Sequence, residues 1–324
     1  METQVDHTAH NHYAEPLDAI VLAGTDDNPR RMILGQNKAF LEIGDTPLVR
    51  RVTEALLAAD QVGQVFVVGP LDRLKPVLAG LGDRVSAVAQ AGKMVKNAWA
   101  AIHAAEARHR EHGRPEDPER PLLVTSCDLP LISPESVDDF VGRCARIDAE
   151  AREGFAMLCG VAEEASLSQY YPDAGLPGIE RPYVNFADCR VRLANIYVGR
   201  PRKLTNQTFL QTGFEHRKAA KLKNVLALAW DFLSQPAGWE AAWLTARMQA
   251  TLMAERAGSR WYPKLRAGNS LQRTEKVCSQ VLGGSIKVVI TPYGGLSLDA
   301  DNEEDFRVLN QRFEDWRLVP PREC

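Results

Sequence analysis

The stretch from Asp18 to Gly44 combines a short apolar run with a glycine turn and cationic side chains. Ala19–Ala23 predicts a buried strand that stops at Gly24. Glycine lets the backbone approach a ligand without a Cβ, and cationic side chains suit the oxygens of a polyphosphate. Three such side chains follow the strand: Arg30, Arg31 and Lys38. The stretch therefore predicts a phosphate-binding loop, and the alternative is a surface loop with solvated arginines.

Two familiar phosphate loops are excluded, because the strand is followed neither by G-x-G-x-x-G nor by G-x-x-x-x-G-K with Ser or Thr. A second candidate turn, Gln90–Lys93, follows the apolar run Val85–Ala89. Open α/β sheets bind ligands at the carboxyl ends of their strands. This turn is therefore a candidate ligand contact, and the alternative is a loop that only reverses the chain.

Carboxylates occur at two places where a structural role explains them poorly. Asp128 follows the predicted strand Leu122–Ser126, and an unpaired buried carboxylate costs several kcal/mol, so it needs a partner or a cation. Asp299 and Asp301 precede an acidic segment near the carboxyl terminus. For Asp128 the alternative is that it caps a turn. For the later carboxylates the alternative is an acidic first turn that complements the dipole of the last helix, which explains Glu303, Glu304 and Asp305 well but Asp299 and Asp301 less well.

Together these segments resemble the MobA-like nucleotidyltransferase family, a group that includes molybdenum-cofactor guanylyltransferase. The resemblance rests on Leu22-Ala23-Gly24, Arg31-Met32, Lys38, Phe40-Leu41, Gly44 and Pro47-Leu48, on Cys127-Asp128-Leu129-Pro130, and on the Leu298–Phe306 stretch. It departs from the family pattern where Thr25 replaces a second glycine.

The resemblance implies roles for individual residues. It makes Lys38, Arg31 and Asp128 catalytic, and it places Mg²⁺ on Asp128 and Asp301. It also implies a nucleotide-binding set, in which the turn at Gln90 holds the base and ribose: Leu22, Ala23, Gly24, Arg30, Lys38, Gln90, Gly92 and Asn97.

Apolar strands alternate with helical segments through the first half of the chain, which predicts a mainly parallel sheet. Strands are expected at Val65–Val68 and Val85–Ala89, with helices at Leu71–Leu81 and Val95–Arg108; Thr46 is expected to cap a helix that starts at Pro47. The resemblance extends this to a GT-A-like, Rossmann-type mixed sheet flanked by helices. The expected organisation is a disordered tail (1–16), a nucleotidyltransferase domain (17–200 and 284–316), a helical insertion (201–283) and a second tail (317–324).

The insertion carries two apolar stripes at helical spacing. One comprises Leu222, Val225, Leu226, Ala229, Phe232 and Leu233, and the other Trp239, Ala242, Trp243, Ala246, Ala250 and Met253. The tryptophan stripe is predicted to be core. The alternative is a subunit interface, which would make the protein a homo-oligomer.

The composition of the chain indicates which kinds of partner it can bind and in which cellular compartment it is expected. The 324 residues carry a net charge of -3, so the chain has no bulk attraction for nucleic acid or anionic membranes. No apolar run reaches the roughly 18 residues of a membrane span. The six cysteines form no C-x-x-C pair, which is typical of reduced thiols and favours a cytoplasmic location.

The leading hypothesis is a Mg²⁺-dependent enzyme that moves NMP from an NTP to a phosphorylated or hydroxyl small-molecule acceptor, releasing pyrophosphate. One alternative is a glycosyltransferase with a nucleotide-sugar donor, because Asp299-Ala300-Asp301 is a D-x-D sequence. Another is a nucleotide-binding regulator without turnover.

Overall fold

The computed structural model describes residues 11–24, 32–207 and 238–323. Its centre is an eight-stranded sheet in the order β12-β9-β11-β8-β1-β6-β7, with β10 paired to β11. The strands are β1 Leu17–Leu22, β6 Val62–Gly69, β7 Val85–Ala89, β8 Leu122–Ser126, β9 Met157–Glu163, β10 Val184–Asn185, β11 Arg190–Gly199 and β12 Ile286–Thr291.

Four neighbouring strands, β8, β1, β6 and β7, are all parallel, and β12 is parallel to β9. Among the described strands of this sheet, only the pairs of β11 with β8, β9 and β10 are antiparallel. The mixed, mainly parallel sheet predicted from the sequence is therefore confirmed.

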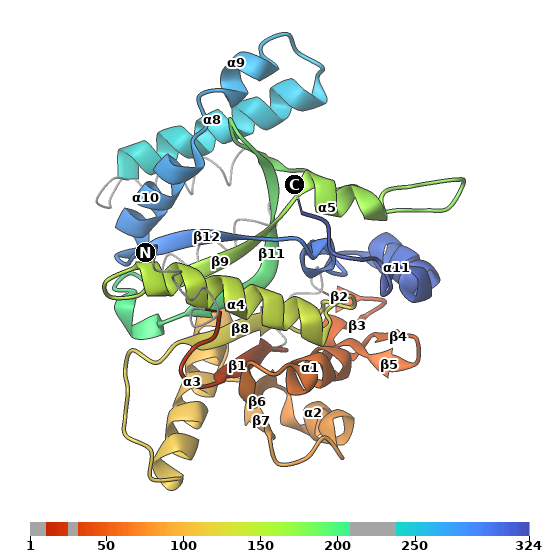
Figure 1. Cartoon of the computed structure of the whole chain (residues 1–324). Coiled ribbons are helices and arrows are strands. Elements are labelled where there is room, and N and C mark those ends of the chain that lie inside the picture. The colour runs from red at the N-terminus through yellow and green to blue at the C-terminus, as the bar shows by residue number, and fades with distance from the viewer. Residues whose placement is uncertain (1–10, 25–31, 208–237, 324) are drawn as a thin grey trace, which may run out of the picture.

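Helices cover both faces of this sheet (Figure 1). Their bounds are α1 Leu48–Ala58, α2 Leu71–Leu78, α3 Met94–Glu111, α4 Pro134–Glu150, α5 Glu164–Leu167, α8 Gly238–Arg256, α9 Tyr262–Arg266, α10 Leu271–Leu282 and α11 Glu303–Trp316. Ser133 begins α4 with a capping box: its side chain accepts a hydrogen bond from the Ser136 N–H, and its own N–H donates to the Ser136 hydroxyl.

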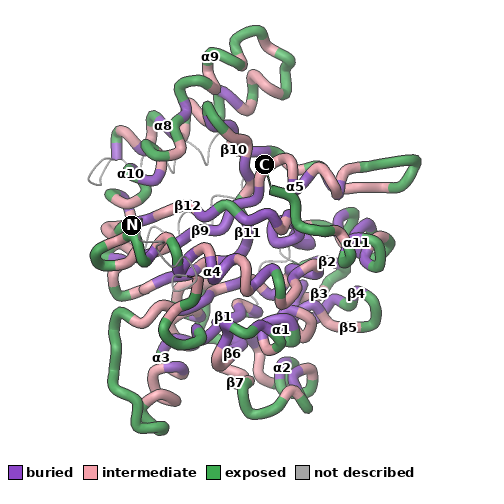
Figure 2. The backbone as a smooth tube through the Cα atoms, in the orientation of Figure 1, coloured by how far each residue is buried: buried purple, intermediate pink, exposed green. Residues whose placement is uncertain are grey.

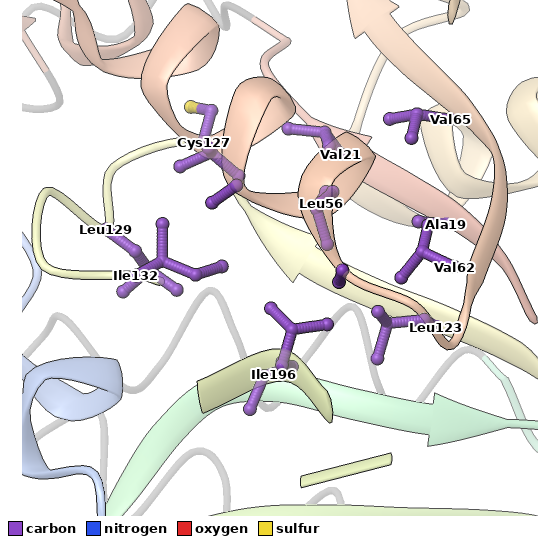
Figure 3. Close-up of a cluster of buried hydrophobic side chains, with 14 of the residues drawn as sticks. Ala19, Val21, Leu56, Val62, Val65, Leu123, Cys127, Leu129, Ile132 and Ile196 are labelled. Atoms are coloured by element: carbon purple, nitrogen blue, oxygen red, sulfur yellow. The ribbon is translucent and has the colours of Figure 1, made fainter. Parts of the chain in front are cut away.

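Alternate residues of β1 explain how two layers form on one strand. Ala19 and Val21 pack with α1 and α4, whereas Ile20 packs with α3, and all three are fully buried. Figure 2 shows the buried residues concentrated along the strands. Figure 3 shows part of the first cluster, where Leu56 and Ile196 contribute from α1 and β11.

Two small hairpins connect β1 to α1: β2 Met32–Ile33 with β3 Gln36–Asn37, and β4 Glu42–Ile43 with β5 Thr46–Pro47. Gly44 and Asp45 both have positive φ, at 57° and 58°, which a two-residue hairpin turn of this kind requires. The expected cap at Thr46 is wrong for this reason: Thr46 and Pro47 are extended, and α1 begins at Leu48 without a side-chain cap.

The helices α8, α9 and α10 group at the top of the view in Figure 1, away from α1, α2 and α3 at the bottom. Within this group Ala241 and Leu244 of α8 pack against Val277 and Val281 of α10. Residues 208–237 of the predicted insertion, including its first apolar stripe, lie outside the described residues.

The second apolar stripe was predicted to be core, and this is wrong. Trp239, Trp243 and Met253 are 74%, 41% and 64% exposed, because the opposite face of α8 makes the contacts with α10. Helix α8 is apolar on two faces, so helical spacing alone could not tell which one is buried.

The first residues of the described chain contact helix α4. Tyr13, within the tail predicted to be disordered, donates a hydrogen bond of 2.7 Å to Asp148 of α4, which ties this part of the tail to the fold.

Among the described helices, none has the length and apolarity needed to cross a membrane.

Candidate active site

The candidate residues gather at one edge of the sheet. Because β8, β1, β6 and β7 are parallel, their carboxyl ends lie at the same edge. Gly24 follows β1, Gln90 follows β7 and Asp128 follows β8. This is the edge where open α/β sheets bind their ligands.

Asn97, in the first turns of α3, organises the turn at Gln90. Its side-chain oxygen accepts hydrogen bonds from the Ala91 and Gly92 N–H groups at 2.7 and 3.0 Å, and the residue is 5% exposed. Gly92 has a φ of +128°, which favours glycine. The turn is therefore held in one conformation by a side chain of the following helix.

Gly24 lies against the same asparagine. A Cβ on Gly24 would lie 2.3 Å from Asn97 Nδ2 and 3.6 Å from Gln90 Oε1, so only glycine fits without displacing Asn97. Apart from Lys38, the predicted nucleotide-binding residues in the described part of the chain thus form one group: Leu22, Ala23, Gly24, Gln90, Gly92 and Asn97.

Lys38 connects this group to the carboxylates. It begins a 3₁₀ turn, Lys38–Phe40, that is capped by Asn37. The Asn37 side chain also donates to the Ala23 carbonyl at 3.1 Å, which fastens the lysine turn to the end of β1. Lys38 is 7% exposed, and its Nζ lies 3.3 Å from Asp128 Oδ2 and 3.2 Å from Asp301 Oδ1.

These contacts determine the charge state of the lysine. Burial favours the neutral amine, but the carboxylates of Asp128, Asp301 and Asp299 outweigh it and raise the pKa of Lys38. Lys38 is therefore an ammonium ion shared between carboxylates from two segments far apart in the chain.

The segment containing Asp299 and Asp301 lies directly beside Asp128. The Ala300 N–H donates to the Asp128 carbonyl at 3.4 Å, which joins the two segments. Asp299 is only 3% exposed, and burial, followed by the charges of Asp128 and Asp301, raises the pKa of its carboxyl group. Glu303, Glu304 and Asp305 occupy the first turn of α11, as the helix-dipole interpretation predicted for them.

Two arginines complete the cluster, and sequence reasoning did not identify them. Arg192 Nη2 lies 3.4 Å from Asp299 Oδ1 and 3.9 Å from Asp301 Oδ2, and its Nε donates to the Ser297 carbonyl at 3.1 Å. Arg181 pairs with Asp305 and lies 4.0 Å from Asp301. The sequence signal for Arg192 is weak: it is a charged residue beside the apolar Val191 and Leu193 in a strand that also contains Arg190 and Asn195.

The donor set suits magnesium. No group of three or more His, Cys, Asp or Glu side chains in the described parts of the chain could hold a metal. Magnesium, however, needs only one or two protein carboxylates when phosphate oxygens and water supply its other ligands. Asp128 and Asp301 present hard oxygens that already converge on one cation, the Lys38 ammonium. The positions of Asp128 and Asp301 are therefore compatible with the prediction that these two residues bind Mg²⁺.

Two predicted site residues, Arg30 and Arg31, lie outside the described residues.

The fold resembles that of a known structure. A structure from Thermus thermophilus described as a hypothetical transferase is 23% identical, covers 90% of this chain and 99% of its own, and gives a TM-score of 0.57. This similarity establishes the fold alone.

Two more distant structures each give a TM-score of 0.45 and cover 93% of this chain and 99% of their own. One is 4-diphosphocytidyl-2C-methyl-D-erythritol synthase from Anaerococcus prevotii, at 11% identity, and the other is CMP:2-keto-3-deoxy-manno-octonic acid synthetase in complex with CTP, at 12%. No curated protein matches the chain.

The family assignment comes from the sequence itself. The model of the MobA-like NTP transferase domain matches residues 19–184, slightly more than half of the chain. The matched region includes the glycine turn, Lys38, the Gln90 turn and Asp128, whereas Asp301 lies beyond it. The chain therefore belongs to the MobA-like NTP transferases and is a nucleotidyltransferase.

Proposed function

We propose that the protein moves NMP from an NTP to a phosphorylated or hydroxyl small-molecule acceptor, with release of pyrophosphate and a requirement for Mg²⁺. The observation that carries this proposal is the position of Lys38, between Asp128 and Asp301 and fastened through Asn37 to the glycine turn. Nucleotidyl transfer needs cationic charge beside the phosphates and a rigid contact for the nucleoside. The Lys38 ammonium and the turn that Asn97 holds support the proposal that this edge supplies both.

Each residue has a definable task. Asp128 and Asp301 would hold the metal, which supplies charge to the non-bridging phosphate oxygens. Lys38 stabilises the negative charge that develops on the departing pyrophosphate. Gly24 lets the phosphates approach the backbone, and Asn97 fixes the Ala91–Gly92 turn against the nucleoside.

The reaction needs no covalent intermediate on the protein. An acceptor oxygen in line with the α-phosphorus forms the new P–O bond while the bond to pyrophosphate breaks. The role of the protein is therefore to position the two substrates and to stabilise charge.

A glycosyltransferase with a nucleotide-sugar donor remains the alternative, because Asp299-Ala300-Asp301 lies within the cluster rather than on a distant surface. It would transfer a sugar and release a nucleoside diphosphate instead of pyrophosphate. A nucleotide-binding regulator would release neither product.

One experiment separates these functions. The protein is incubated with Mg²⁺ and each of four NTPs, together with a panel of phosphomonoesters and sugars, and products are followed by ³¹P NMR. We expect pyrophosphate and an NMP adduct in equal amounts, and Asp128→Asn should suppress both. In a separate incubation, nucleotide-sugars replace the NTPs as donors. Release of nucleoside diphosphate there would favour the glycosyltransferase. Tight NTP binding without either product would favour the regulator.

A further inference from the structure

Lys38 stands where a cofactor cation is expected. Its ammonium group approaches both predicted metal ligands, Asp128 and Asp301, at hydrogen-bond distance. A divalent metal ion that entered between the same oxygens would be repelled by the ammonium group at short range. The Lys38 ammonium and a divalent metal ion therefore cannot both contact Asp128 and Asp301 at short distance at the same time.

Two neighbouring arginines are held by more contacts than Lys38 and are less able to move away from the carboxylates. Arg192 is fixed by the Ser297 carbonyl and by Asp299, and Arg181 by Asp305 and the Asp299 carbonyl. Both lie 3.9 to 4.0 Å from Asp301, outside hydrogen-bond distance. A lysine is a point charge on a flexible stem, whereas an arginine fork is held by several directed contacts. Lys38 is thus the cation best suited to leave.

The backbone of Lys38 is already placed for a second position. Asn37 fastens the lysine turn to the Ala23 carbonyl, next to the predicted phosphate contact at Gly24. The lysine stem can therefore turn from the carboxylates toward a triphosphate without a change in the main chain.

We infer that Lys38 is an exchangeable cation, which neutralises Asp128 and Asp301 in the free protein and moves to the triphosphate when the metal and nucleotide bind. This inference rests on the proposed function for the identity of the ligands. Its consequence is that the free protein has little affinity for a divalent metal. Nucleotide and metal then bind with strong mutual dependence, because the nucleotide draws away the lysine that competes with the metal.

The test measures Mn²⁺ binding to the full chain by electron paramagnetic resonance, first without nucleotide. We expect Lys38→Met to bind Mn²⁺ at least about tenfold more tightly than the wild type, since the competing charge is gone. Lys38→Arg keeps a positive charge and should bind Mn²⁺ no more tightly than the wild type. Lys287→Met removes a lysine that pairs with Glu275 away from the site, and it is the matched control expected to leave Mn²⁺ affinity unchanged.

The second arm adds the α,β-methylene analogue of each NTP. In the wild type, Mn²⁺ affinity should rise at least about tenfold with the analogue that binds, and the gain should be smaller in Lys38→Met. Equal Mn²⁺ affinity in wild type and Lys38→Met without nucleotide would overturn the inference. If Lys38→Met does not fold, the wild type still decides, because unchanged Mn²⁺ affinity with a bound analogue would also overturn it.

Failure of the inference can be told apart from failure of the proposed function. Pyrophosphate release together with unaltered Mn²⁺ affinity in Lys38→Met would retain the transferase and reject the exchange. The expected Mn²⁺ results without any transfer product would retain the exchange and reject the transferase.

Discussion

Arg190 and Lys38 each lie between two carboxylates from distant segments, and they are held in different ways. Arg190 pairs with Glu164 and Glu255 through separate nitrogens, while its Nε donates to Asn185 at 2.9 Å and its guanidinium lies 4.9 Å from the centre of the Tyr183 ring. Lys38 contacts Asp128 and Asp301 through one nitrogen, at 3.3 and 3.2 Å.

The difference shows that a cation placed between two carboxylates does not by itself indicate a reactive site. Arg190 has several independent directed contacts and joins α8, through Glu255, to the start of β11, so its place is structural. Lys38 has one donor group shared by two acceptors beside a glycine turn. The number and direction of the contacts separate a fixed cation from an exchangeable one.

The largest effect should come from Asp128→Asn, with a rate loss of roughly a thousandfold, because on the proposed function this change removes the main protein charge opposite the metal. Asp301→Asn should be milder, since its carbonyl oxygen can still serve as a ligand. Turnover of both variants is measured against Mg²⁺ concentration. Equal losses, or a larger loss at Asp301, would reverse the assignment of the two ligands.

Lys38→Ala should weaken NTP binding by roughly ten- to a hundredfold, the usual effect of removing a charge-assisted contact. Nucleoside binding should change far less, because we propose that the Gln90 turn, and not Lys38, contacts the base and ribose. Calorimetry with NTP and with nucleoside measures the two effects, and Lys287→Ala is the control. The same NTP affinity in wild type and Lys38→Ala would remove Lys38 from the phosphate site.

Arg190→Met should act on stability and not on turnover. It leaves Glu164 and Glu255 without their partner; since these side chains are partly exposed, we expect a loss of about 1 to 3 kcal/mol in the free energy of unfolding. Urea denaturation measures it. Arg273→Met, which breaks an exposed pair with Glu240, should cost less than about 0.5 kcal/mol. A large fall in turnover at unchanged stability would give Arg190 a functional role.

Gly24→Ala should weaken NTP binding by about tenfold, because its Cβ would displace the Asn97 side chain that fixes the Gln90 turn. Gly92→Ala is the comparison: its Cβ would meet only Lys96 Cδ, at 3.6 Å, although its φ of +128° adds strain. NTP affinity is measured for both after their stability is checked. A weaker effect at Gly24 than at Gly92 would contradict the role given to Asn97.

The smallest effect is expected for Trp239→Ser on α8. Since Trp239 is 74% exposed, the free energy of unfolding should change by less than about 0.5 kcal/mol. A loss of more than 1 kcal/mol that depends on protein concentration would instead indicate a subunit interface on this face.

Local patterns predicted local structure well and long-range pairing poorly. The strands Val85–Ala89 and Leu122–Ser126 match the prediction because each is an apolar run bounded by loop residues. The approach of Lys38 to Asp128 followed from the edge shared by parallel strands. Arg192 reaches Asp299 only because β11 inserts antiparallel between β8 and β9, and no spacing in the sequence reveals that insertion.

The distance along the chain between Lys38 and Asp301, 263 residues, has a consequence for synthesis. A chain growing from its amino terminus can form β1, β6, β7 and β8, with Lys38 beside Asp128, long before Asp301 has been made. Closing so long a loop comes late in folding, because its entropy cost is met only after the intervening strands have paired. On the proposed function, the nascent protein would therefore hold only one of its two metal ligands until the segment that carries Asp301 folds beside Lys38.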